Sequence, residues 1–190
     1  KVFLLEDSQL VKNSEKQTIS EKAVQPHITH INADDVWDLG YTGKNVLVAL
    51  IDTGADINHI DLKDNLWDGG DEFPNHGYNT YEDNHNINDG FGHGTHCAGI
   101  ICGNGTSGTQ TGIAPDATIM VVKVMDDGGY GGASGICSGM EFSLEHGADL
   151  FNMSLGIPNA SVSAKEMLRN SCINTMQAGI AATVAVGNEG

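Results

Sequence analysis

Three polar side chains at distant points of the sequence have the types that acid–base chemistry needs. Asp52 directly follows an apolar run, His93 opens a glycine-containing segment, and Asn188 lies in a glycine-containing segment farther along. A carboxylate beside an imidazole fixes the ring tautomer and stabilises the imidazolium that forms when the ring takes a proton. A side-chain amide can donate a hydrogen bond to a developing oxyanion. These types predict a proton-transfer site if the fold brings them together.

Four apolar runs predict the strands that position these residues. They are residues 46–51, 118–124, 150–153 and 180–186. Short, unbroken apolar runs are typical of strands that are buried on both faces of a parallel sheet.

The segments between these runs predict helices. Two helices are expected over about 93–102 and 133–146, and a third is expected to begin at a capping box formed by Ser163 and Glu166. The third helix should bury three residues at helical spacing: Leu168, Cys172 and Met176. Alternating strands and helices predict an α/β fold, a doubly wound parallel sheet with helices on both faces.

A further short helix is expected near residue 35. Asn32 can cap it, Val36 and Trp37 lie on its apolar side, and Gly40 can end it. Residues 68–89 are rich in acids and Asn, and this stretch predicts a solvated surface loop rather than a calcium site with EF-hand spacing.

The predicted sheet gathers the polar junctions at one edge. Ligands of an open parallel sheet bind beyond the carboxyl ends of its strands. Asp52 ends the first predicted strand, and residues 126–132, 154–156 and 187–190 follow the other three. The edge of the sheet is therefore the expected site.

Four motifs along this edge resemble those of the subtilisin-like serine proteases, the subtilase family. Residues 49–54, Ala-Leu-Ile-Asp-Thr-Gly, resemble the aspartate motif, and residues 93–99, His-Gly-Thr-His-Cys-Ala-Gly, resemble the histidine motif. Residues 152–156 resemble the segment that lines the substrate cleft, and residues 185–190 the segment with the oxyanion-hole asparagine. The motifs occur in the family's order, and the resemblance covers residues 28–190.

The resemblance implies a role for each matched residue. Asp52 would orient the imidazole, His93 would be the general base, and Asn188 would stabilise the oxyanion. Main-chain groups of two segments would hold the substrate as an added β-strand. These segments are Gly129, Tyr130 and Gly131, and Ser154, Leu155 and Gly156. The implied activity is peptide-bond hydrolysis by a serine endopeptidase.

One family motif is absent from these 190 residues. The family's serine motif, a Gly-Thr-Ser-Met-Ala-like sequence, does not occur, and the sequence ends two residues after Asn188. We therefore expect a fold that is incomplete at its C-terminus and inactive alone, with the missing segment as its partner. Residues 1–27 are expected to form an N-terminal arm or propeptide remnant, and residues 28–190 the N-terminal part of the catalytic domain. A peptide-binding pseudoprotease is the alternative.

The resemblance implies no cofactor for the chemistry, and it leaves room for structural calcium near Asp61. The loop over residues 104–110 has Thr106 and Gly108 where stronger calcium ligands are expected. Cys97 matches a subset of the family in which a thiol lies beneath the catalytic histidine. The four cysteines show no metal-ligand spacing and are expected to be buried free thiols.

Composition limits the partners. Acids outnumber bases 25 to 9, giving a net charge of −16, which argues against a nucleic-acid surface because phosphates need a positive field. No apolar run approaches the roughly 20 residues of a membrane helix. Peptides or proteins remain as substrates, and secretion is the family's usual destination.

Two other hydrolase classes fit single motifs. Asp52-Thr-Gly54 also resembles the aspartic proteases, but that fold is all-β and needs two such aspartates. His93 and His96 are three residues apart, as in some zinc sites, but the Glu of the His-Glu-x-x-His motif is missing. His96 is expected to be a packed residue that supports the site.

Overall fold

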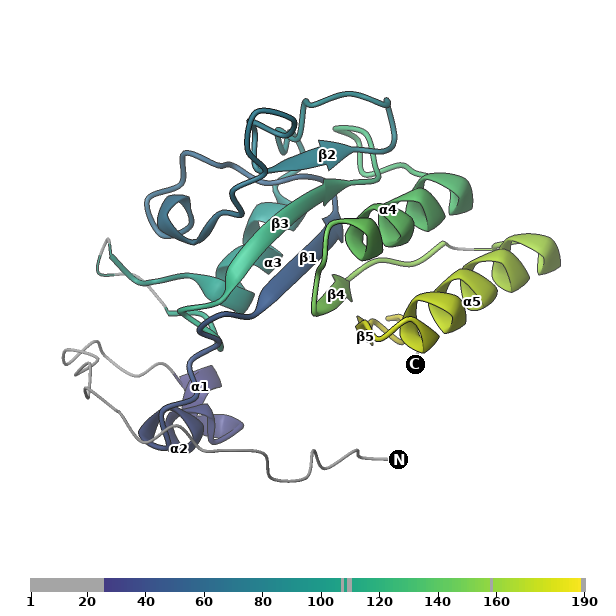
Figure 1. Ribbon diagram of the computed structural model, residues 1–190. Helices are drawn as coiled ribbons and strands as arrows, with labels where there is room; N and C mark the ends of the chain where they lie inside the picture. Colours follow the sequence, from purple (N-terminus) through teal and green to yellow (C-terminus); the bar gives the residue numbers. More distant parts are fainter. Residues whose placement is uncertain (1–25, 107, 109–110, 158, 189–190) are drawn as a thin grey trace.

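A five-stranded parallel sheet organises the fold (Figure 1). In this computed structural model the described residues are 26–106, 108, 111–157 and 159–188. The strands lie in the order β2–β3–β1–β4–β5. Their bounds are Leu47–Asp52 for β1, Gly77–Asn79 for β2, Thr118–Lys123 for β3, Leu150–Met153 for β4 and Ala181–Val184 for β5.

Helices cover both faces of the sheet. Those that pack on it are α3 (His93–Cys102) on one face, and α4 (Ala133–Glu145) and α5 (Val162–Gln177) on the other. In Figure 1 the short helices α1 (Pro26–His30) and α2 (Ala33–Asp38) lie together beyond one end of the sheet, and a 3-10 helix spans Lys63–Asn65. The predicted doubly wound α/β architecture is confirmed.

Alternate residues of the central strand β1 face different helices. Val48 and Leu50 belong to the core cluster that contains residues of α3, whereas Ala49 and Ile51 belong to the cluster that contains residues of α4. All four side chains are buried. A strand covered on both faces must be apolar at every position, which is why the run is unbroken.

The predicted strands and helices agree closely with the structure, with one omission. The strand over 150–153 and the helix over 93–102 have the predicted bounds, and the other three predicted strands differ by at most two residues at an end. The prediction of a surface loop over 68–89 was wrong in part, because β2 lies within it and pairs with β3. Phe73 and Ile87 from the same stretch are buried in the core.

The start and the buried face of α5 differ from the prediction. Ser161, not Ser163, caps the helix, and its hydroxyl oxygen accepts the Ala164 N–H at 3.2 Å. Met176 is 52% exposed, and Thr175 is the buried residue of this helix. Leu168 and Cys172 are partly buried against the core cluster of α4, as predicted, whereas Met176 lies in the last turn of α5 and is not part of that cluster.

The predicted cap of α2 is also corrected. Asn32 precedes the helix in the left-handed region at φ 57° and makes no side-chain cap bond, because it forms a turn between α1 and α2. Val36 is exposed, whereas Trp37 turns inward and donates its indole N–H to the Ile113 carbonyl at 2.8 Å. Gly40 follows the helix end as predicted, and its N–H bonds to the Trp37 carbonyl.

Three further predictions concern the N-terminal arm, the cysteines and membrane-spanning helices. Of the predicted arm, residues 1–25 lie outside the described residues and Pro26 and His27 lie in α1, so that boundary stays a prediction. All four cysteines are free, as predicted, although Cys172 is only partly buried. Among the described helices, none has the length and hydrophobicity needed to cross a bilayer.

Gly77→Ala should destabilise the protein by about 1–3 kcal/mol, the usual cost of overpacking. A Cβ atom at Gly77 would lie 1.8 Å from the Val121 carbonyl oxygen, so β2 could not keep its place beside β3. Urea unfolding followed by circular dichroism measures the change. Gly99→Ala is the control, because no heavy atom outside its chain neighbours and the adjacent helix backbone lies within 4 Å of its new Cβ. It should gain about 0.5–1 kcal/mol in a helix interior. Equal effects of the two substitutions would contradict this account of β2.

Candidate active site

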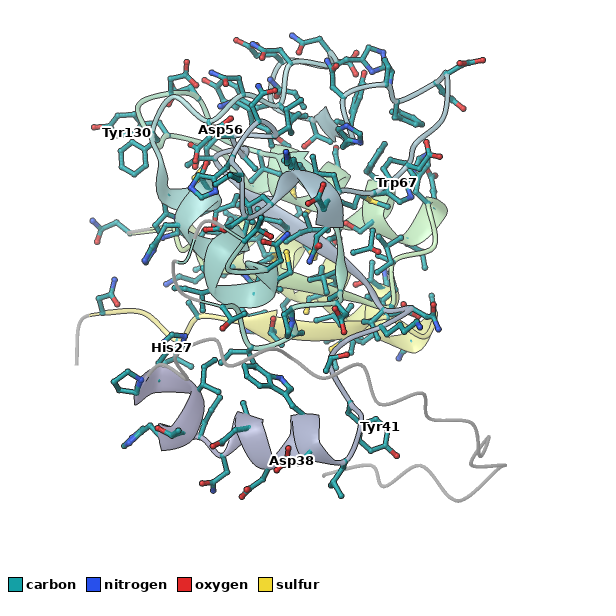
Figure 2. The ribbon with its side chains drawn as sticks, turned by 90° about the vertical axis from the view of Figure 1, so that its left-hand side faces the viewer. His27, Asp38, Tyr41, Asp56, Trp67 and Tyr130 are labelled. Carbon is teal, nitrogen blue, oxygen red and sulfur yellow. The ribbon has the colours of Figure 1, made fainter. Side chains whose placement is uncertain are left out.

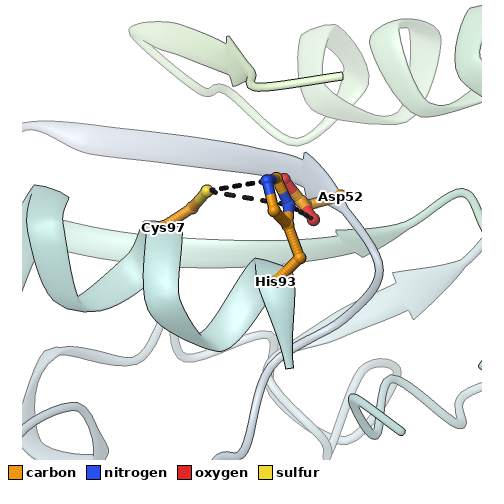
Figure 3. A group of neighbouring side chains, drawn as sticks. All are labelled: Asp52, His93 and Cys97. Carbon is orange, nitrogen blue, oxygen red and sulfur yellow. Dashed lines mark hydrogen bonds and ion pairs between the residues drawn. The ribbon is translucent and has the colours of Figure 1, made fainter. Parts of the chain in front are cut away.

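The site begins with Asp52, the last residue of β1, whose side chain is fully buried. Its Oδ1 atom accepts two hydrogen bonds, from the Thr53 N–H at 2.7 Å and from Nδ1 of His93 at 2.7 Å (Figure 3). Both donors bond to the same oxygen, so they fix the position of the Asp52 carboxyl group beside the imidazole.

His93 reaches Asp52 because α3 begins unusually close to the end of β1. A Cβ atom at Gly94 would lie 2.0 Å from the Gly54 carbonyl oxygen and 3.2 Å from Cβ of Asp52. Only glycine permits this approach of the two backbones. The His93 side chain remains 41% exposed, so its ring contacts the buried carboxylate on one side and solvent on the other.

A polar network fixes the start of α3 against the end of β1. The Thr53 hydroxyl donates to Oδ1 of Asp89 at 2.8 Å, and its oxygen accepts the Gly94 N–H at 2.9 Å. The Asp89 carboxylate also accepts the Gly92 N–H at 2.7 Å, the Thr95 N–H at 2.8 Å and the Thr95 hydroxyl at 2.6 Å. Asp89 thus satisfies the free N–H groups at the helix start.

The surroundings of Asp89 favour its charged form. Burial raises its pKa, but the hydrogen bonds from Thr95, Gly92 and Thr53 outweigh burial, and the pKa lies below the ordinary carboxyl value. Sequence reasoning missed this residue, because it stood among other acids of a predicted surface loop. The available signal was its position, since carboxylates are preferred just before the first turn of a helix.

Cys97 lies one helical turn beyond His93. Its Sγ is 3.8 Å from Nδ1 and 3.9 Å from Nε2 of the ring (Figure 3). Burial, followed by the charge of Asp52, raises the pKa of the thiol to about 11. The thiol is therefore protonated at neutral pH and is a poor nucleophile.

The same three side chains could in principle hold a metal ion. In the part of the chain that the structure describes, Asp52, His93 and Cys97 form the group whose ligand atoms all lie within 4.8 Å of one another. Metal ligands must be deprotonated, and the raised pKa of the Cys97 thiol opposes this. The arrangement suits proton transfer better than metal binding.

The predicted substrate segment at Gly129, Tyr130 and Gly131 belongs to a compact loop after β3. Oδ1 of Asp126 accepts the N–H groups of Gly128 and Tyr130 at 2.9 Å each, and the Asp126 N–H bonds to the Tyr130 carbonyl. Tyr130 is 76% exposed and lies at the end of the molecule opposite α2 (Figure 2). The loop is therefore held in shape by one carboxylate while its outer side is open.

The segment after β4 approaches α3. Ser154 accepts a hydrogen bond from the Asn152 side chain at 2.9 Å, and a hydrogen bond from the Ser154 hydroxyl lowers the pKa of the Cys97 thiol, an effect smaller than those of burial and Asp52. Leu155 packs on the core cluster of α4, and Gly156 is exposed. This end of β4 therefore lies beside the Asp52–His93 pair.

Two other residues that the sequence singled out, Asn188 and His96, are both exposed. Asn188 is exposed beyond the carboxyl end of β5, on the predicted edge, and no hydrogen bond between described residues joins it to Asp52 or His93. His96, predicted to be packed, is exposed because it points away from the sheet side of α3 that carries Cys97.

The calcium prediction concerns a separate loop. Asp61 is buried, and its carbonyl accepts the Asn104 N–H at 3.0 Å. Residues 107, 109 and 110 of the neighbouring loop lie outside the described residues. Calcium binding stays a prediction.

Comparisons with known proteins match a family model and several relatives. The family model described as "Subtilase family" matches residues 43–190. The chain is 38% identical to the minor extracellular protease Vpr of Bacillus subtilis (strain 168) over 181 residues, which cover 91% of this chain and 22% of that protein.

Two further relatives come from the same organism. The major intracellular serine protease is 37% identical over 161 residues, covering 84% of this chain and 48% of the relative. Subtilisin E is 35% identical over 196 residues, covering 97% of this chain and 48% of the relative. The aligned region is less than half the length of each of these three relatives. The resemblance predicted from the four motifs is confirmed.

Asp89→Ala should lower the free energy of unfolding at pH 7 by about 0.5–2 kcal/mol, the usual effect of losing an N-terminal helix cap. The lowered pKa of Asp89 means that its stabilisation is fully present above the ordinary carboxyl pKa of 3.8 and is lost as the pH falls through the lower folded value. The difference between variant and wild type should therefore shrink in strong acid. Urea unfolding at several pH values measures it, with the exposed Asp38→Ala as control. A difference that does not change with pH would contradict the role of the charge.

Proposed function

The chain belongs to the subtilase family, and from this premise we propose that it supplies the acid–base pair of a serine endopeptidase. The observation that carries the proposal is the 2.7 Å hydrogen bond between Nδ1 of His93 and Oδ1 of Asp52. Asp52 is fully buried and His93 is partly exposed. This combination supports an orienting carboxylate and a base that a substrate can reach.

The bond to Asp52 supports one tautomer of the His93 ring. A carboxylate accepts, so Nδ1 carries the proton and Nε2 carries the lone pair. In the proposed reaction Nε2 of His93 takes the hydroxyl proton of a serine as the serine oxygen bonds to the peptide carbonyl carbon. The carbonyl electron pair moves to its oxygen, and the Asn188 amide would donate to that oxyanion. His93 then gives the proton to the leaving amine as the C–N bond breaks.

The nucleophile would lie in the part of the protein that follows residue 190. These residues contain Gly-Thr-Ser once, at 105–107, where Gly and Thr follow instead of the Met and Ala of the serine motif. The three relatives named above are more than twice as long as the aligned region. We propose that this later segment completes the fold and supplies the serine, with residues 1–190 inactive alone.

Peptide or protein substrates would bind as an added strand. Gly129 to Gly131 and Ser154 to Gly156 follow β3 and β4, the two neighbours of β1 in the sheet. Both segments lie at the carboxyl ends of their strands, on either side of Asp52. Glycine at three of the six positions keeps the main chain of these segments uncovered by side chains. The Gly129 and Tyr130 N–H groups and the Tyr130 carbonyl already bond to Asp126, so pairing would use the other main-chain groups.

We also propose that the protein is secreted. The relative named as a minor extracellular protease supports this location, and the intracellular protease of the same organism represents the alternative. The proposed chemistry requires no cofactor, and structural calcium near Asp61 is proposed as an addition to the fold rather than to the reaction.

Labelling of the full-length protein by a fluorophosphonate probe tests the proposal. The probe reacts with an activated serine, so the wild type should be labelled and should hydrolyse peptides. His93→Ala should abolish labelling, and Asp52→Asn should lower kcat by about 10⁴-fold because the tautomer is no longer fixed.

His96→Ala is the matched control, since His96 is on the same helix, is exposed and lies outside the pair. Its activity should stay within about twofold of the wild type. Absence of labelling in a folded wild-type protein would overturn the endopeptidase proposal and favour the peptide-binding pseudoprotease.

A further inference from the structure

A buried lysine connects three segments of the proposed site. Lys123 is the last residue of β3 and is only 3% exposed. Its ammonium donates to the Thr53 carbonyl at 2.6 Å, to the Asn88 carbonyl at 2.9 Å and to Oδ1 of Asp127 at 2.9 Å. An ammonium has three N–H donors, so all of them are used.

The burial of Lys123 requires these three partners. A buried ammonium without acceptors is strongly unfavourable. The carbonyls of Thr53 and Asn88 supply two acceptors at fixed positions of the main chain, and Asp127 supplies the countercharge. The ammonium therefore restrains the positions of the three segments that carry its acceptors.

Each partner belongs to a different part of the site. Thr53 directly follows Asp52 and bonds to Asp89, and Asn88 directly precedes Asp89. Both are therefore parts of the network that holds the Asp52–His93 pair. Asp127 lies in the loop after β3 that contains the proposed substrate segment, Gly129 to Gly131.

A second set of contacts holds the two loops together. The Gly90 N–H donates to Oδ1 of Asp127 at 3.3 Å, and a Cβ atom at Gly90 would lie 2.3 Å from Cγ of Asp127. A Cβ atom at Gly129 would lie 3.2 Å from the Phe91 ring. The loop that precedes His93 is thus packed directly against the loop that contains the substrate segment.

Asp127 is charged when it binds Lys123. The hydrogen bond and the charge of Lys123 hold the pKa of Asp127 below its ordinary value. The Asp127 side chain is itself 68% exposed, so only its contact with Lys123 and Gly90 reaches inward. Removing this carboxylate would cut the link to the loop without leaving a cavity in the core.

We propose that Lys123 is a positioning residue that, through Asp127, sets the position of the substrate segment relative to the Asp52–His93 pair. The inference rests on the proposed function, because it concerns the distance between the substrate segment and the Asp52–His93 pair. Neither Lys123 nor Asp127 contacts the imidazole, so their effect is on substrate position and not on the proton transfer itself.

Asp127→Ala in the full-length protein tests the inference. The substrate segment would lose its charged anchor, so KM should rise about three- to tenfold, the net scale of one ordinary hydrogen bond. The value of kcat should stay within about twofold, because the Asp52–His93 bond is untouched. Peptide hydrolysis at several substrate concentrations separates the two parameters.

Two variants control for other effects of the substitution. Asp127→Glu keeps the carboxylate and should recover most of the wild-type KM, which a merely structural role of the loop does not require. Asp38→Ala removes an exposed acid on α2, at the opposite end of the molecule, and should change neither parameter (Figure 2). An unchanged KM in Asp127→Ala, or an equal rise in Asp38→Ala, would overturn the inference.

A double-mutant cycle asks whether the effect passes through the lysine. In the Lys123→Met background, Asp127→Ala should produce no further rise in KM, because the link is already absent. A rise as large as in the wild-type background would overturn the role of Lys123. If the Lys123→Met protein does not fold, the comparison of Asp127→Ala with Asp127→Glu still tests the positioning role of the carboxylate.

A binding measurement separates this inference from the proposed function. A fluorescent peptide with a reduced scissile bond cannot be cleaved, and its anisotropy reports affinity without turnover. If the wild type binds it but hydrolyses nothing, the endopeptidase proposal fails, while three- to tenfold weaker binding by Asp127→Ala still supports the positioning role. Equal affinity of wild type and Asp127→Ala would overturn the positioning role even in an active enzyme.

Discussion

The hydrogen bond between Asp52 and His93 constrains the rest of the structure more than any other contact. It joins residues 41 positions apart at 2.7 Å, and one partner is fully buried. A deviation of about 1 Å in such a pair is large for catalysis. The end of β1 and the start of α3 must therefore be placed relative to each other with an accuracy that neither element provides alone.

Apolar packing places α3 on the sheet but cannot orient the His93 ring. Burial of Cys97 and Ala98 against Leu50 depends on area, and the hydrophobic effect has no direction. Directional contacts add the orientation. The close approach at Gly94 sets the distance, and the bonds of Asp89 and Thr53 set the angle at which the helix begins. At this junction, therefore, apolar packing places α3 on the sheet, and the directional contacts orient its first turn.

Sequence reasoning predicted the parts of the fold that local pattern determines. The run that ends at Asp52 and the helix that begins at His93 could be assigned because burial on both faces and helical periodicity act over neighbouring residues. β2 could not be predicted, because its three residues acquire strand geometry only by pairing with β3. The α5 cap was misplaced by two residues, since Ser161 and Ser163 offer the same hydroxyl, and the backbone at Ser161 decides which one caps.

The polar residues that support the site were hidden from sequence reasoning for a related reason. Asp89 and Lys123 have ordinary local contexts, an acidic loop and a strand end. Besides partners nearby in the sequence, each bonds to residues 35 or more positions away, and these bonds tie the segments of the site together. Lys123 nevertheless left a signal, because a single charge inside an apolar strand must find acceptors at the sheet edge or destabilise the fold. The carboxyl edge of a parallel sheet is where loops can supply carbonyls to such a charge. A buried cation is therefore best tolerated at the edge where ligands bind, and its bonds restrain the loops that a binding site needs to keep still.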